Sequence, residues 1–191
     1  IGPGCQQASN SLAAYEHSFA TGLLEAATQC ACDTQAVLLV GFDVEAVGPL
    51  RQVHRSEGLL AGAFVLSPTR TERSLAAFDW SLVHGPATPV PPRSDAARQL
   101  PPNAIADALP VFEALANFSP TEAAAPLRLP LSAQLPLEVR LRPAQGSADD
   151  AAAYNAGSAA GPWGPSVPLL PLRDPAKGLM PWTTIPCPCT T

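Results

Sequence analysis

The chain is poor in charge and has no concentrated positive charge. Only 14% of its 191 residues are charged, the formal net charge is -5, and the sole lysine is Lys177. Proteins that hold a phosphate backbone or an anionic lipid surface do so with clusters of lysine and arginine, and this sequence has none. We therefore expect no nucleic-acid partner.

Long apolar runs are also lacking. The longest stretches, such as residues 36–42, are far shorter than the roughly 20 residues that a helix needs to cross a bilayer, and no basic segment followed by an apolar one precedes them. We expect a cytoplasmic protein with no membrane insertion. Because the chain opens at Ile1 rather than at Met, we also expect a fragment of a longer reading frame.

Cysteines are few, and their number is odd. Cys5, Cys30, Cys32, Cys187 and Cys189 leave one thiol unpaired in any disulfide scheme, so reduced thiols are the simpler interpretation. A four-thiolate zinc site would have to use two pairs with only one intervening residue, which is not the usual spacing of zinc ligands. We expect neither a metal site nor a cofactor.

Hydrophobic residues make up 47% of the chain, enough for the core of one domain. Residues 16–29 carry apolar side chains at three- and four-residue spacing, which predicts a helix with one buried face. Residues 36–44 form a short, nearly continuous apolar run that predicts a strand buried on both faces. Residues 59–66 and 75–83 predict two further strands.

The next part of the chain changes from loop to helix to hairpin. Residues 86–102 contain many prolines and predict an extended surface connection. Asn103 is placed to cap a helix over residues 104–117, which Pro110 should kink or divide into two short helices. Strict alternation of leucine and valine then predicts a hairpin over residues 127–141.

The last quarter of the chain has a different composition. Residues 144–191 are dominated by alanine, glycine, proline and serine and show no periodicity. Such a segment buries too little apolar surface to offset the entropy of ordering. We therefore divide the chain into a domain over residues 1–143 and a disordered tail over residues 144–191.

Residues 9–26, followed by the strand-like residues 37–43, resemble the β-ketoacyl synthase-like N-terminal family. The resemblance extends over residues 1–143, where the later elements follow in the family's order, and the domain's opening segment is missing. It implies an α/β fold, a partial thiolase-like domain with layered sheets and helices. In such a fold, residues 10–15 would form a strand that leads into the helix at residues 16–29 and lies in one sheet with residues 36–44 and 59–66.

The resemblance also places a nucleophile position. In ketosynthases a cysteine stands at the start of this helix, where the helix dipole and backbone N–H groups stabilise a thiolate and an oxyanion. Here that position falls on Ser18, beside His17, and no cysteine lies between Cys5 and Cys30. A serine hydroxyl needs an adjacent base to react. The histidines that complete a ketosynthase site belong to a later half that this chain lacks.

The resemblance therefore implies a non-catalytic partner in acyl-chain elongation, similar to a chain-length factor. Its partners would be a catalytic ketosynthase subunit and an acyl carrier protein, in fatty-acid, polyketide or aryl-polyene biosynthesis. Two alternatives stay open. The first is a ketosynthase-like acyltransferase or 3-oxoacyl-[acyl carrier protein] synthase that uses Ser18, and the second is a truncated, non-functional product.

A hydrolase triad is a weaker hypothesis for the same residues. Ser18 and His17 would need Asp33, Asp43 or Asp79 as a third member, and no Gly-x-Ser-x-Gly elbow surrounds the serine. The simpler interpretation is that Glu16, His17 and Ser18 satisfy backbone N–H groups in the first helical turn.

Three other polar residues have a simple interpretation and an alternative. Asp43, at the end of a predicted strand, would cap a turn or face a binding crevice. His54 and His84 are expected to be solvated loop residues, because neither lies at ligand spacing from other metal-binding side chains.

Overall fold

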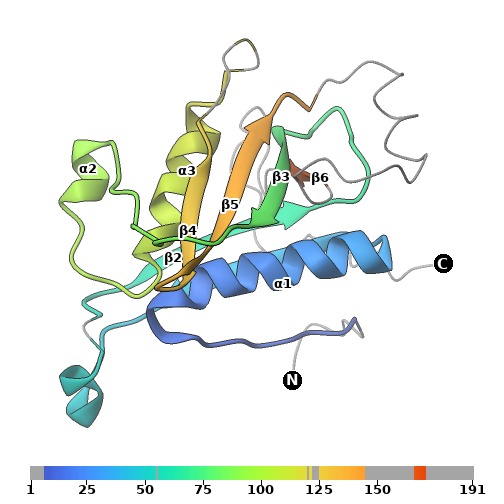
Figure 1. Cartoon of the computed structure of the whole chain (residues 1–191). Helices are drawn as coiled ribbons and strands as arrows, with labels where there is room; N and C mark the ends of the chain where they lie inside the picture. Colours follow the sequence, from blue (N-terminus) through green and yellow to red (C-terminus); the bar gives the residue numbers. More distant parts are fainter. Residues whose placement is uncertain (1–6, 55, 120, 122–124, 145–165, 171–191) are drawn as a thin grey trace, which may run out of the picture.

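A computed structural model describes residues 7–54, 56–119, 121 and 125–144, and the backbone of residues 166–170 (Figure 1). The helical elements are η1 (Tyr15–His17), α1 (Ser18–Asp33), η2 (Gly48–Gln52), α2 (Asp95–Arg98), η3 (Ala106–Ala108) and α3 (Leu109–Ala116). The strands are β1 (Val37–Asp43), β2 (Leu60–Leu66), β3 (Ala76–Leu82), β4 (Leu127–Ser132), β5 (Leu135–Arg142) and β6 (Ser166–Leu170).

The strands form one six-stranded sheet in the order β1-β2-β6-β3-β5-β4. Each described pairing is antiparallel, including the hairpin of β4 and β5 and the long pairing of β1 with β2. The fold is therefore a mixed helix-and-sheet domain, which is compatible with the α/β domain that the sequence resemblance implies. The further layers of a thiolase-type fold stay a prediction.

Helices α1 and α3 pack against the same face of the sheet. Phe19 of α1, Phe64 of β2 and Phe112 of α3 form a cluster of three aromatic rings with centroids 5.6 to 6.2 Å apart. Gly41 and Gly62 lie opposite each other in the β1–β2 pairing, and a side chain at Gly62 would meet the ring of Phe112 at 2.7 Å. The two glycines thus open the space in which the helices' aromatic rings lie.

The core continues along the inner face of β3, β4 and β5. Its buried members there are Ala76, Phe78, Leu127, Leu129, Leu137, Val139 and Leu141. On the opposite face, hereafter the outer face, Asp79 and Glu138 are largely buried and form ion pairs with Arg142 and Arg128 respectively. A buried carboxylate is tolerated when it is paired in this way.

Several predicted elements are confirmed. Helix α1 and strands β2 and β3 match their expected ranges closely, and the hairpin of β4 and β5 is present. Pro110 lies in the first turn of α3, and the next helical segment is divided into η3 and α3, as expected. Asn103 accepts a hydrogen bond from the N–H of Ile105, but the N-cap of η3 is Ile105 itself and has no side-chain cap, so the predicted cap at Asn103 is wrong. The proline-rich connection holds only the four-residue helix α2, which has no buried residue.

Two predictions about strands are wrong. No strand forms over residues 10–15: residues 10–14 have no regular secondary structure, and η1 begins at Tyr15. Strand β1 is not buried on both faces: helices cover its inner face, while Leu38, Val40 and Phe42 are more than half exposed on the outer face. The error arises because apolar residues occupy both sides of this strand, so its sequence does not reveal that one side has no cover.

The expected disordered tail contains a strand. Residues 166–170 form β6 between β2 and β3, which the sequence did not predict because Pro168 lacks the N–H that a strand interior normally uses. Residues 145–165 and 171–191 lie outside the described residues. No helix among the described residues is long and apolar enough to cross a membrane.

Candidate functional site

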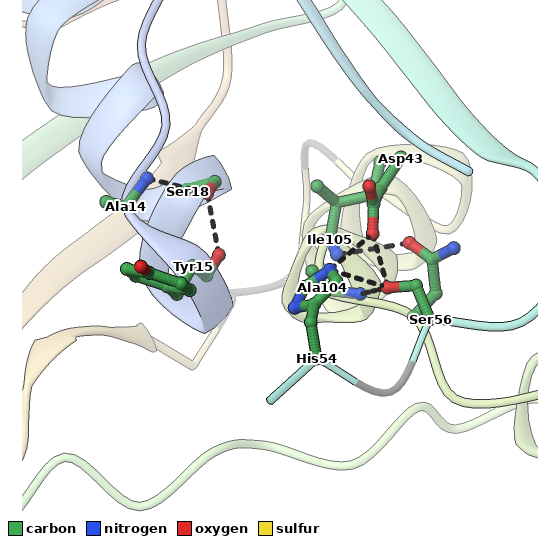
Figure 2. Close-up of polar contacts among 9 residues, drawn as sticks. Ala14, Tyr15, Ser18, Asp43, His54, Ser56, Ala104 and Ile105 are labelled. Atoms are coloured by element: carbon green, nitrogen blue, oxygen red, sulfur yellow. Dashed lines mark hydrogen bonds and ion pairs between the residues drawn. The ribbon is translucent and has the colours of Figure 1, made fainter. Parts of the chain in front are cut away.

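The turn that opens α1 holds the serine expected at the nucleophile position. Ser18 is the first residue of the helix, and its hydroxyl donates a hydrogen bond to the carbonyl of Tyr15 at 2.6 Å. The same oxygen accepts the N–H of Ala14 at 2.9 Å (Figure 2). The hydroxyl therefore closes the turn, and its hydrogen bonds within the described part of the chain go to the backbone and not to a base.

Tyr15 gives this turn a strained backbone. Its φ of 51° is in the left-handed region, which is uncommon for a bulky residue. Such conformations cost on the order of 1–3 kcal/mol and persist where surrounding contacts impose them. Here the hydrogen bonds of Ser18 to Ala14 and Tyr15 hold the conformation.

The ring of His17 is not hydrogen-bonded to the hydroxyl of Ser18 in the described structure. Its backbone carbonyl accepts a hydrogen bond from Thr21 Oγ1 at 2.8 Å, and its ring Nδ1 is buried without a hydrogen-bond partner among the described residues. An imidazole that activates a serine must share a hydrogen bond with the hydroxyl. The structure thus brings His17 and Ser18 into one turn but not into a catalytic pair.

A cavity of about 340 Å³ lies beside this turn. It is formed where η1, the loop after η2 and the segment that leads into η3 meet. Its lining residues are Glu16, His54, Ser56, Pro102, Asn103, Ala104 and Asp107. This polar cavity at the start of α1 is the candidate functional site.

One wall of the cavity is fixed by three polar side chains that share hydrogen bonds. Asp43 Oδ2 lies 3.0 Å from His54 Nε2 and accepts a short hydrogen bond from the hydroxyl of Ser56. Ser56 Oγ also lies 3.0 Å from His54 Nε2 and accepts the N–H of Ala104 at 3.0 Å (Figure 2). The three residues tie the end of β1 to the loop after η2 and to the start of η3.

This arrangement is not a hydrolase triad. In a triad the carboxylate and the serine use different ring nitrogens of the histidine. Here Asp43 and Ser56 both approach Nε2 of His54, and Ser56 is only 3% exposed. Its hydroxyl donates to the carboxylate, so the trio acts as a structural clasp of Asp43, His54 and Ser56.

The clasp also determines the ionisation of Asp43. Burial alone would raise the pKa of its carboxyl, but hydrogen bonds from Ser56 and His54 and from the N–H of Val44 outweigh burial. The pKa of Asp43 therefore lies below its ordinary value, and the carboxylate is ionised at neutral pH.

Asp107 has the opposite environment. Burial raises its pKa to about 7, and neither carboxylate oxygen has a hydrogen-bond partner among the described residues. The nearby N–H groups of Ala20, in the first turn of α1, and of Asp107 and Ala108 lower the pKa in part, although none of them reaches hydrogen-bonding geometry. The positive end of α1, which would stabilise an oxyanion in a catalyst, thus already faces a carboxyl group of the chain itself.

The cysteines within the described residues do not form a metal site. Cys30 is buried in α1, where burial raises the pKa of its thiol to about 11, whereas Cys32 is exposed. The two thiols therefore differ in accessibility, and none of the described residues form a group of three potential metal ligands. Cys5, Cys187 and Cys189 lie outside the described residues.

The other candidate residues are dispersed. Asp33 is the last residue of α1, Asp79 pairs with Arg142 on the outer face, and His84 is exposed after β3. Sequence reasoning found Asp43 and His54 separately but did not join them to Ser56. It also missed Asp107, because an aspartate within a short helical segment gives no sign that its carboxyl group will be buried.

Comparison with protein families assigns the chain to a class. The model of the β-ketoacyl synthase N-terminal domain matches residues 1–109, more than half of the 191 residues. The chain belongs to the β-ketoacyl synthase N-terminal domain family. The match ends as α3 begins, so the hairpin of β4 and β5 lies beyond it although it pairs into the same sheet. Neither the curated proteins nor the solved structures include a significant match.

Proposed function

We propose that this chain is a non-catalytic partner of a ketosynthase in acyl-chain biosynthesis. Family membership supports a role in that biosynthesis. The lack of catalysis is supported by the turn at α1, where a ketosynthase would carry a reactive cysteine. Ser18 stands there with both hydrogen-bonding functions of its hydroxyl engaged by the backbone of residues 14 and 15.

The surroundings of Ser18 support the same proposal. A serine nucleophile needs a base within hydrogen-bonding distance and N–H donors free to receive an oxyanion. His54 is engaged with Asp43 and Ser56, and Asp107 faces the N-terminal turn of α1. Negative charge on Asp107 at this helix end would repel a developing oxyanion.

Labelling with an acyl thioester tests the proposal. Incubation of the full chain with a radiolabelled acyl-acyl carrier protein is expected to leave the chain unlabelled, because the turn at α1 shows no activated nucleophile among the described residues. Ser18→Ala is the matched control. Label that appears on the wild-type chain and disappears in Ser18→Ala would establish the alternative function, a ketosynthase-like acyltransferase.

The partner role needs a separate experiment. A ketosynthase from the same source, an acyl carrier protein and malonyl thioester are combined with and without this chain. The proposal predicts a change in condensation rate or in product length when the chain is added. An unchanged rate and product would contradict the partner role and favour a truncated, non-functional product.

A further inference from the structure

The segment between β1 and β2 projects from the body of the domain. Residues 44–54, which we call the arm, include the 3₁₀ helix η2, the teal turn that extends away from the sheet in Figure 1. The apolar side chains of the arm lie largely in water: Val44, Val47, Leu50 and Val53 are 54%, 69%, 49% and 73% exposed. The arm therefore presents apolar side chains to the solvent rather than to the core.

Three of these side chains are spaced to share one face. A 3₁₀ helix has three residues per turn, so side chains three positions apart lie above one another. Val47, Leu50 and Val53 have this spacing, and they are the N-cap residue, the middle residue and the C-cap residue of η2. We call these three residues the arm stripe. With a rise of about 2.0 Å per residue, the arm stripe is roughly 12 Å long.

The arm stripe is uncharged, and the charges beside it cancel. Arg51 and Glu45 form an exposed ion pair, with Nη2 and Oε1 3.1 Å apart. Residues 44–53 contain no other charged side chain. An apolar stripe beside a neutralised pair fits an apolar groove with a polar rim, as protein interfaces commonly have, and offers no net charge to a charged surface.

The arm is held in position at its base. Ala46 is buried, and its N–H donates a hydrogen bond to the carbonyl of Ser56 at 2.9 Å. The clasp joins Asp43, just before the arm, to His54 at its end. The N–H of His54 also donates to the carbonyl of Leu50 at 2.9 Å. Because the backbone of the arm is already fixed by these bonds, the arm stripe loses less entropy when it binds a partner.

Two cavities among the described residues are unsuited to the arm stripe of a second copy. The cavity of about 340 Å³ is polar, with Glu16, His54 and Asp107 in its lining. A second cavity, lined in part by Pro89 and Leu129, has a volume of only about 10 Å³. That volume suits one water molecule and not a leucine side chain. These cavities therefore favour a groove on a different protein.

We propose that the arm stripe docks into an apolar groove on the catalytic ketosynthase subunit, with Leu50 as the central anchor and Val47 and Val53 on either side of it. This inference rests on the proposed partner role and names the surface that performs it. Apolar side chains at one-turn spacing that enter a groove are a common mode of recognition for short helical segments. Removal of the stripe from water drives the contact, and the ion pair of Glu45 with Arg51 stays at the rim.

Calorimetric titration of the full chain with the catalytic ketosynthase from the same source tests the proposal. Val47→Asp/Leu50→Asp should weaken binding by about 100-fold, because two carboxylates would enter an apolar groove. Leu100→Asp is the matched control, since Leu100 is 46% exposed, close to the 49% of Leu50, and lies outside the arm. This control should bind as the wild type does. Thermal unfolding of each variant verifies that the fold is retained.

A photo-cross-linker tests the contact without adding a charge. Benzoyl-phenylalanine in place of Val53 should join the chain to the ketosynthase, and the same probe at Leu100 should not. If Val47→Asp/Leu50→Asp binds as tightly as the wild type, or the probe at residue 53 gives no cross-link in the bound complex, docking by the arm is overturned while the partner role stands. A wild-type chain that does not bind overturns both. A cross-link from residue 53 to a second copy of this chain would also overturn the proposal.

Discussion

The hydroxyl of Ser18 is engaged twice by the backbone around it. It accepts a hydrogen bond from Ala14 and donates one to Tyr15, whose left-handed conformation forms the turn before α1. A hydroxyl that closes a turn has no free proton for a neighbouring base. At the scale of single residues, the hydroxyl of Ser18 therefore stabilises the turn before α1.

Replacing Ser18 by cysteine separates thiol reactivity from condensation. Ser18→Cys places a thiol at a helix N-terminus, so alkylation faster than that of an ordinary surface thiol is expected. We predict no 3-ketoacyl product, since each missing oxyanion donor costs about 2.7–4 kcal/mol in a transition state. The product is measured by mass spectrometry with no ketosynthase added. A 3-ketoacyl product would show that the site can still be activated.

Asp107 and Asp43 predict opposite dependences of stability on pH. The folded state raises the pKa of Asp107 to about 7, so it favours the protonated form. The free energy of unfolding should therefore fall as the pH rises from about 4, the ordinary pKa of an aspartate, to about 7. Asp107→Asn removes this loss and should stabilise the chain above pH 7 by roughly 2–4 kcal/mol, while leaving it unchanged below pH 4.

Asp43→Asn is the matched control with the reverse sign. The folded state lowers the pKa of Asp43, so this carboxylate stabilises the fold above the ordinary pKa and the contribution is lost as the pH falls through the lowered pKa. The variant should be less stable than the wild type at neutral pH and equal to it in strong acid. Urea unfolding of both variants across this pH range is the measurement. Equal effects of the two substitutions at pH 8 would refute the assigned environments.

At the scale of elements, β1 has two unlike faces. Leu39 lies on the inner face, where its Cδ1 is 3.4 Å from the position that a side chain on Gly22 of α1 would take. Val40 is on the outer face and is 53% exposed. Adjacent residues of one strand therefore provide a matched pair for testing which face carries the core.

Leu39→Asp should be severely destabilising, because a charge against α1 has no partner and costs several kcal/mol. Val40→Asp should leave a cooperative fold with a small change in the free energy of unfolding. Soluble yield and thermal unfolding of the two variants are compared. Similar losses in both would mean that both faces of β1 are buried.

The paired glycines of β1 and β2 allow a second test of packing. In Gly62→Ala the new methyl group would lie 2.7 Å from the ring of Phe112, so this ring or the whole of α3 must shift, at a cost of about 1–3 kcal/mol. Phe112→Leu removes the ring and should restore part of the stability lost in Gly62→Ala. Chemical unfolding of both single variants and the double variant measures this coupling. Additive losses would indicate that Phe112 does not pack on Gly62.

Sequence predicted the elements better than their environment. Periodicity identified α1, and alternation identified the hairpin of β4 and β5, because both patterns are local. The one-sided burial of β1 depends on where α1 and α3 lie. Strand β6 lies between β2 and β3 and pairs with both. The sequence of residues 166–170 does not indicate this position, because Pro168 is unusual inside a strand. The clasp joins Asp43 to residues 11 and 13 positions later, so only the folded loop reveals it.

At the scale of the whole molecule, the described residues combine a ketosynthase-family fold with a site arranged for structure. The polar cavity at the start of α1 is bordered by a clasp that engages His54 and Ser56 and by the buried carboxyl group of Asp107. The outer face adds an ion-paired half and an apolar half. These features are the ones on which the proposed non-catalytic partner role rests.

The most direct test of this account is a condensation assay that measures 3-ketoacyl product by mass spectrometry. The full chain is supplied with acyl-acyl carrier protein and malonyl-acyl carrier protein, first alone and then with a catalytic ketosynthase from the same source. The account predicts no product from the chain alone and an altered rate or product length when the ketosynthase is present. A 3-ketoacyl product from the chain alone, abolished by Ser18→Ala, would contradict it.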